Sequence, residues 1–180
     1  MVGLGVLAVP FIRVVFGEQW LPAAPILQVL CIVGLLWPLH VINLNVLQAQ
    51  GYANLFFRLE VIKKISGVAL LVTGSFFGIM GIAWSRVIQS IIGLLINGHY
   101  TKKLLHYSMS DQTRDCMPSI LLSIAMGAVV LVADAWIEVG GALELLLLIL
   151  VGASFYLASN LLLGISAFKE AVGFVTTPKS

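Results

Sequence analysis

The sequence predicts an all-α fold: a polytopic membrane helix bundle with five complete transmembrane helices and one partial helix at the N-terminus. Of the 180 residues, 60% are hydrophobic and only 10% are charged, and the mean hydropathy is +1.06. Soluble domains carry about 25% charged residues, so this composition indicates an integral membrane protein. Long apolar runs recur along the chain between short polar turns. We expect residues 1–180 to form a single membrane domain.

The first apolar run, residues 1–16, is short for a complete span and is interrupted by Pro10 and Arg13. It has neither the basic start nor the small-residue cleavage site of a signal peptide. We interpret it as the second part of a helix. Either the chain is a piece of a longer protein, or this helix inserts incompletely.

The next run, residues 25–50, is long enough to cross about 30 Å of hydrocarbon. It contains Pro38 and six polar side chains, which are Gln28, His40, Asn43, Asn45, Gln48 and Gln50. Polar groups and a proline cost free energy in lipid unless neighbouring helices or water satisfy them. The helix is therefore expected to face protein or water. It either lines a passage or hydrogen-bonds to packed neighbours, and the sequence leaves both interpretations open.

A helix is predicted over residues 55–77, with a charged first half. Glu60 can pair with Lys63 and Lys64 at spacings of three and four residues, and the helix becomes fully apolar only from Ile65. The lysines are expected near or inside the membrane boundary. They either extend to the headgroups or line a cavity.

An uncharged turn leads into a helix predicted over residues 79–105. A guanidinium inside a span costs a few kcal/mol unless it is paired or hydrated, so Arg86 is a candidate functional residue. Gln89, Gly93 and Asn97 follow Arg86 at i+3, i+7 and i+11 and are expected to form one polar or small stripe with it. Such a stripe serves close helix packing or lines a wet wall.

Residues 99–115 are predicted to be the one substantial polar loop, and complete spans are predicted over residues 117–135 and 143–165. If the spans alternate, one side collects most of the basic residues, which are Arg58, Lys63, Lys64, Lys102, Lys103, Arg114, Lys169 and Lys179. The positive-inside rule then predicts that both termini are cytoplasmic.

Several function classes are disfavoured by the sequence. The net charge of +2 and the lack of a basic, aromatic-interleaved patch argue against nucleic-acid binding. Cys31 and Cys116 are expected to be free thiols, with no disulfide framework, metal site or cofactor. No HExxH, GxSxG, P-loop or paired-carboxylate motif occurs in the spans, so we do not expect an enzyme.

Four short stretches carry a resemblance to a known family: FGEQW at residues 16–20, AAPIL at 23–27, LQAQG at 47–51 and EVIKK at 60–64. With them, the chain resembles the C-terminal half of bacterial polysaccharide flippases of the Wzx type, which export O-antigen and exopolysaccharide. Their superfamily also contains the multidrug MATE transporters. The resemblance covers essentially the whole chain.

This resemblance implies a fragment of a transporter with two helical lobes around a central cavity. Such proteins move undecaprenyl-pyrophosphate-linked oligosaccharides across the bacterial inner membrane by alternating access. The implied partners are the lipid-linked oligosaccharide, membrane lipids, and a missing N-terminal lobe or partner subunit. A passage for this substrate needs cations for the pyrophosphate and amides for the glycan. The candidate residues are Arg86, Lys63 and Lys64 for the pyrophosphate, and His40, Asn43, Gln48, Gln89 and Asn97 for the glycan.

Two alternatives stay open. The chain is also long enough to be a small transporter or channel subunit that completes its pathway by homo-oligomerising. It is equally compatible with a membrane assembly factor that transports nothing, in which the polar side chains make contacts between helices.

Overall fold

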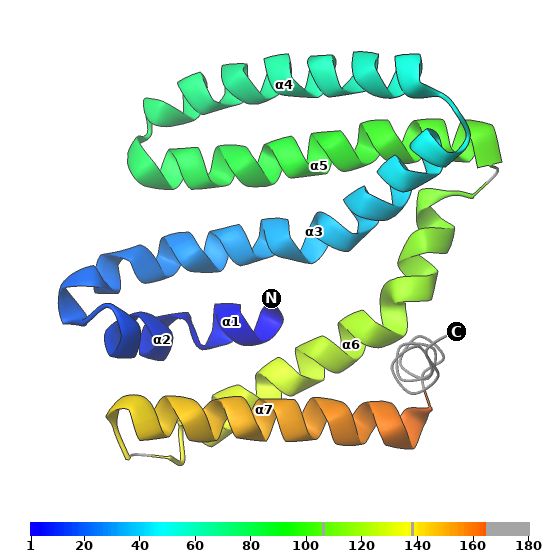
Figure 1. Ribbon diagram of the computed structural model, residues 1–180. Coiled ribbons are helices and arrows are strands. Elements are labelled where there is room, and N and C mark those ends of the chain that lie inside the picture. The colour runs from blue at the N-terminus through cyan, green and yellow to red at the C-terminus, as the bar shows by residue number, and fades with distance from the viewer. Residues whose placement is uncertain (106, 138, 165–180) are drawn as a thin grey trace, which may run out of the picture. The chain divides into compact units, whose positions relative to one another are not determined.

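The computed structural model describes residues 1–105, 107–137 and 139–164, and within these ranges it contains α-helices, one 3-10 helix and no strand (Figure 1). The predicted all-α fold is confirmed. The described chain forms two compact units, of which the first is Met1–Asp115 and the second begins at Cys116. Each unit is described by itself below.

The N-terminal run forms two short helices, α1 (Val2–Val6) and α2 (Ala8–Val15), which meet at Leu7. Pro10 explains the break. It has no N–H to donate to the carbonyl of Val6, and its ring crowds that carbonyl, so the helix cannot continue regularly past this point. The predicted partial helix is therefore helical but divided in two.

A 3-10 helix, η1 (Glu18–Ala23), follows Gly17 and leads into α3 (Ala24–Ala49). Gly17 has φ 91°, a value that favours glycine because it has no Cβ. Pro38 lies inside α3 and removes one backbone hydrogen bond, and Figure 1 shows that α3 changes direction in its second half.

The helices α4 (Ala53–Ser75) and α5 (Gly78–Leu105) form an antiparallel pair that packs along its length (Figure 1). Their backbones come closest next to the connecting turn. A Cβ added to Gly74 would lie only 2.7 Å from the carbonyl oxygen of Gly81. Glycine is thus required both at Gly74, near the end of α4, and at Gly81, near the start of α5.

Four of the helical segments in the described part of the chain are long and apolar enough to cross a membrane: Glu18–Asn45, Gly78–Lys103, Met109–Asp134 and Gly141–Leu163. By length and composition, four segments therefore qualify as complete spans where the sequence predicted five. The helix that does not qualify is α4, because Arg58, Glu60, Lys63 and Lys64 lower the hydropathy of its first half.

The polar loop predicted over residues 99–115 is also much shorter than expected, because α6 (Met109–Asp134) begins eight residues before the predicted start at residue 117. Ser108 and Asp111 explain the early start. The Ser108 N–H donates to Asp111 Oδ2 over 3.0 Å, and the Asp111 N–H donates to Ser108 Oγ over 3.3 Å. This reciprocal pair caps the first turn of α6.

The second unit contains the rest of α6 and α7 (Gly141–Leu163), the predicted last span. The two helices meet where Val130 Cγ2 lies 3.0 Å from the position that a Cβ on Gly152 would take. Asn160 is buried and donates to the carbonyl of Tyr156 in its own helix over 2.8 Å. The predicted basic residues Lys169 and Lys179 lie outside the described residues.

Candidate functional site

Two neighbouring groups of hydrogen-bonded polar side chains lie inside the first unit, one joining α3 to α5 and the other joining α4 to α5. We call them together the polar cluster, and its members are His40, Glu60, Lys63, Gln89, Ser90 and Asn97. Four of these six, His40, Lys63, Gln89 and Asn97, are among the predicted site residues. The predicted polar faces of three separate helices therefore meet in one place.

Lys63 is at the centre of the polar cluster. Its ammonium forms a salt bridge with Glu60 one helical turn earlier, and it donates to Asn97 Oδ1 over 3.1 Å. The side chain of Lys63 is 11% exposed and that of Glu60 is 30% exposed. A charged pair is cheaper to bury than a lone ammonium, so Glu60 makes the position of Lys63 tolerable in an apolar environment.

Asn97 lies on α5 opposite Lys63 and is completely buried. Its Oδ1 must face Lys63, because an ammonium only donates hydrogen bonds. This orientation leaves Nδ2 without a hydrogen-bond partner among the described residues. Buried polar groups are nearly always satisfied, so this N–H group has an unused capacity to bind an oxygen acceptor.

Gln89 holds the backbone of Lys63 in place. Its Nε2 donates to the carbonyl oxygen of Lys63 over 2.5 Å, and its Oε1 accepts from Ser66 Oγ over 3.4 Å. Gly67 makes room for this amide, since a Cβ there would lie 3.3 Å from Gln89 Cδ. The polar cluster is thus built on the α4 backbone as well as on its side chains.

His40 enters the polar cluster from α3, just after Pro38. Its Nε2 lies 3.0 Å from Ser90 Oγ on α5. Gly93 lies between His40 and Lys63: a Cβ added there would be 3.3 Å from His40 Cε1 and 3.5 Å from Lys63 Cδ. A glycine at this position lets side chains from α3 and α4 approach the same point of α5.

Asn43, a further predicted site residue, belongs to a separate contact. It exchanges two hydrogen bonds with Gln112 at the start of α6, over 2.7 Å and 3.0 Å. Both side chains are buried, with exposed fractions of 0% and 2%. Gln112 was missed by sequence analysis because it lay in the predicted polar loop. The Ser108 and Asp111 cap was the signal for a helix there.

The other three predicted site residues, Gln48, Lys64 and Arg86, are exposed on the first unit. Arg86 was expected to share a stripe with Gln89, Gly93 and Asn97, and this is wrong for Arg86. Its neighbours Ser85 and Val87 are each 4% exposed, whereas Arg86 points away from the packed face. For all eight candidates, a role in substrate binding stays a prediction.

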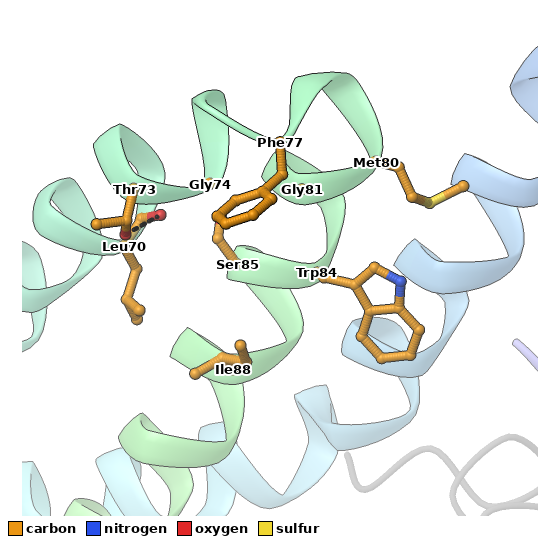
Figure 2. Close-up of a pocket in the computed structure, with 9 residues that line it drawn as sticks. All are labelled: Leu70, Thr73, Gly74, Phe77, Met80, Gly81, Trp84, Ser85 and Ile88. Atoms are coloured by element: carbon orange, nitrogen blue, oxygen red, sulfur yellow. Dashed lines mark hydrogen bonds between the residues drawn. The ribbon is translucent and has the colours of Figure 1, made fainter.

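A pocket of about 430 Å³ lies elsewhere in the first unit, where α4 ends and α5 begins (Figure 2). Its lining residues are Leu70, Thr73, Gly74, Phe77, Met80, Gly81, Trp84, Ser85 and Ile88. Figure 2 shows the ring of Phe77 projecting from the turn toward Ser85. The lining is almost entirely apolar and contains no charged group, so it differs chemically from the polar cluster.

Long apolar helices together with buried polar contacts between them define a class: the chain is a multi-pass α-helical membrane protein. Comparison with known proteins narrows the class. The chain is 36% identical over 135 residues to "Teichuronic acid biosynthesis protein TuaB" of Bacillus subtilis, an alignment that covers 72% of this chain and 27% of that protein.

Two further relatives carry similar names. "Lipopolysaccharide biosynthesis protein WzxC" of Escherichia coli is 30% identical over 98 residues, covering 54% of this chain and 20% of the relative. "Uncharacterized membrane protein in cps region" of Klebsiella pneumoniae is 28% identical over 159 residues, covering 87% and 33%. The resemblance to Wzx-type polysaccharide biosynthesis proteins is thus confirmed. The chain spans about a quarter of the length of the first relative. No family model matches the chain, and no solved structure matches it significantly.

Proposed function

We propose that this chain is part of a transporter that flips a lipid-linked oligosaccharide from the inner to the outer leaflet of the bacterial inner membrane. The observation that carries the proposal is the similarity to two proteins named for teichuronic acid and lipopolysaccharide biosynthesis. Polymers of this kind are assembled from precursors that must leave the cytoplasm, and a multi-pass helical protein without a catalytic motif suits transport better than synthesis.

The polar cluster supports the same proposal on physical grounds. A pyrophosphate is anionic and a glycan carries many hydroxyl groups, so a passage for such a substrate needs ammonium, amide and hydroxyl groups within the bundle. Lys63 supplies the ammonium, Gln89 and Asn97 supply amides, and Ser90 supplies a hydroxyl. The undecaprenyl-pyrophosphate carrier itself is inferred from the family resemblance.

We also propose an orientation with the basic residues in the cytoplasm. The start of α4 and the end of α5 lie at the same end of the first unit (Figure 1), which brings Arg58 to the same end as Lys102 and Lys103. By the positive-inside rule this end is cytoplasmic, as are both chain termini. A second lobe or partner subunit would complete the passage.

Deletion of the gene in its own host tests the proposed function. We expect lipid-linked oligosaccharide to accumulate in the inner leaflet and the surface polysaccharide to decrease, with recovery when the wild-type gene is supplied. Precursors are measured by mass spectrometry of extracted lipids, and their leaflet by a membrane-impermeant glycan-modifying enzyme. Normal surface polysaccharide without accumulated precursor would contradict transport and favour an assembly role.

A further inference from the structure

The polar cluster contains more hydrogen-bond donors than acceptors at one point. The ammonium of Lys63 has three N–H donors, two of which are directed to Glu60 and Asn97. Asn97 Nδ2, on the same amide that accepts from Lys63, is completely buried and has no partner among the described residues. The only acidic group in the polar cluster is the carboxylate of Glu60.

An excess of donors beside an ammonium selects an anionic oxygen. A cation would be repelled by Lys63, and a neutral hydroxyl would satisfy the Asn97 amide without using the positive charge. Hydrogen bonds from an ammonium are strongest to carboxylate and phosphate oxygens. The carboxylate of Glu60 already shows that the ammonium accepts this kind of partner here.

The two charged side chains differ in their exposure to solvent. The side chain of Glu60 is 30% exposed whereas that of Lys63 is 11% exposed, so the carboxylate is the more accessible partner of the pair. Glu60 can turn away from the cluster with less loss of packing than Lys63. The Gln89 amide meanwhile keeps the Lys63 backbone fixed through its 2.5 Å hydrogen bond.

We propose that Lys63 and Asn97 form a binding site for a phosphate oxygen, and that Glu60 holds Lys63 when this ligand is absent. Binding transfers the ammonium from the Glu60 carboxylate to the phosphate, and Asn97 Nδ2 donates to a second oxygen of the same group. Lys63 is neutralised by Glu60 before binding and by the phosphate oxygen after it, and the released Glu60 carboxylate keeps its charge and is solvated on its 30% exposed side. Glu60 therefore competes with the ligand and sets its affinity.

Identifying the phosphate as that of an isoprenyl pyrophosphate carrier rests on the proposed function. The same chemistry is found in the headgroup of an anionic phospholipid. The experiment must therefore separate a carrier pyrophosphate from a lipid headgroup, and it must separate either of them from a purely structural role for the ion pair.

The test uses the full chain in phosphatidylcholine nanodiscs, with inorganic pyrophosphate and farnesyl pyrophosphate as probes and calorimetry as the readout. We expect Glu60→Gln to tighten pyrophosphate binding about tenfold, because the competing carboxylate is removed. We expect Lys63→Gln to weaken it by about tenfold or more, and Asn97→Leu by several-fold. Lys103→Gln, at an exposed lysine of the same helix as Asn97, is the matched control and should leave the affinity unchanged.

The combination Glu60→Gln with Lys63→Gln adds a second criterion. If Glu60 acts only by competing for Lys63, then Glu60→Gln has no effect in a chain that already lacks the lysine. If Glu60→Gln does not fold by circular dichroism, Glu60→Asp replaces it. Its carboxylate is one methylene shorter and should give a smaller increase in affinity.

The outcomes are distinct. Tighter binding by Glu60→Gln for both probes supports the site, and a further gain for farnesyl pyrophosphate identifies the carrier as its ligand. If adding phosphatidylglycerol to the nanodiscs weakens pyrophosphate binding in the wild type but not in Lys63→Gln, the site is supported with a lipid headgroup as its occupant. Unchanged or weaker binding by a folded Glu60→Gln chain overturns this inference, whereas the gene deletion above tests transport independently.

Discussion

Asn43 on α3 and Gln112 on α6 exchange two hydrogen bonds through side-chain amides that are almost completely buried. The pair joins the half of α3 that follows Pro38 to the first turns of α6. Neither amide can turn to water without breaking both bonds. This pair is therefore expected to hold the bent part of α3 in place.

Replacing one partner should destabilise the chain more than replacing both. We expect Asn43→Leu to lower the free energy of unfolding by about 1–2 kcal/mol, because it leaves the Gln112 amide buried and unpaired. The double substitution with Gln112→Leu should cost less than the sum of the single ones. Denaturing-detergent titration in mixed micelles measures these values. Gln48→Leu, at an exposed position of the same helix, is the control, and strictly additive effects would contradict a coupled pair.

The helical elements themselves were largely predictable, because apolar runs of membrane length leave few other structures possible. The start of α6 was not, since the composition of residues 99–115 outweighed the short capping pattern of Ser108 and Asp111. The number of spans differs for another reason. Residues 55–77 were counted as a span although their first half is charged, and by length and composition the helix there does not qualify.

The site was predictable in part. Polar residues in apolar helices were correctly expected to need partners, and His40, Lys63, Gln89 and Asn97 do meet. Which of them meet depends on how the helices are rotated and spaced, and that is set by tertiary packing. Arg86 shows the limit: its spacing from Gln89 suggested a common face, but three residues turn a helix by about 300°, enough to move Arg86 off the packed face.

The close approach of Gly74 and Gly81 predicts a strong size restriction next to the α4–α5 turn. We expect Gly74→Ala to cost about 1–3 kcal/mol, because its Cβ would lie 2.7 Å from a backbone oxygen that cannot move independently. Gly5→Ala is the matched control, since its Cβ would meet Cys31 at an ordinary 3.6 Å. Thermal unfolding in detergent compares the two, and equal melting temperatures would contradict the close contact.

We expect the substitution Gly93→Ala to reduce pyrophosphate binding more than it reduces the stability of the chain. The Cβ of Gly93→Ala would press on His40 Cε1 at 3.3 Å and on Lys63 Cδ at 3.5 Å, and both are flexible side chains that can shift by a few tenths of an ångström. We expect a loss of stability of under about 1.5 kcal/mol, partly offset by the higher helix propensity of alanine. Pyrophosphate affinity should fall by several-fold because Lys63 is displaced. A large stability loss with unchanged affinity would show that the polar cluster is structural only.

Substitution of the capping residue Ser108 is expected to fray the first turn of α6. Ser108→Ala removes the oxygen that accepts from the Asp111 N–H and should destabilise the first turn of α6 by about 1 kcal/mol. Hydrogen exchange at the amides of Asp111 and Gln112 should accelerate about fivefold. Ser123→Ala, in the same helix but away from the cap, is the control. Equal protection in both variants would count against the cap.

Arg86 gives the prediction that depends most directly on transport. Its guanidinium lies on the exposed side of α5 between two buried residues, so in a membrane it either extends to the headgroups or meets a part of the transporter that faces α5. If it attracts the pyrophosphate in such a passage, then Arg86→Gln in the complete transporter should reduce flipping at least several-fold without lowering membrane abundance. Arg86→Lys should retain part of the activity because it keeps the charge.

Thiol labelling separates the two environments of Arg86. In a chain whose free Cys31 and Cys116 have been replaced, Arg86→Cys should react with a polar reagent only if water reaches that face of α5. In that case, labelling should fall when pyrophosphate is added. Full flipping by Arg86→Gln together with no labelling of Arg86→Cys would place this side chain against lipid and remove it from the transport pathway.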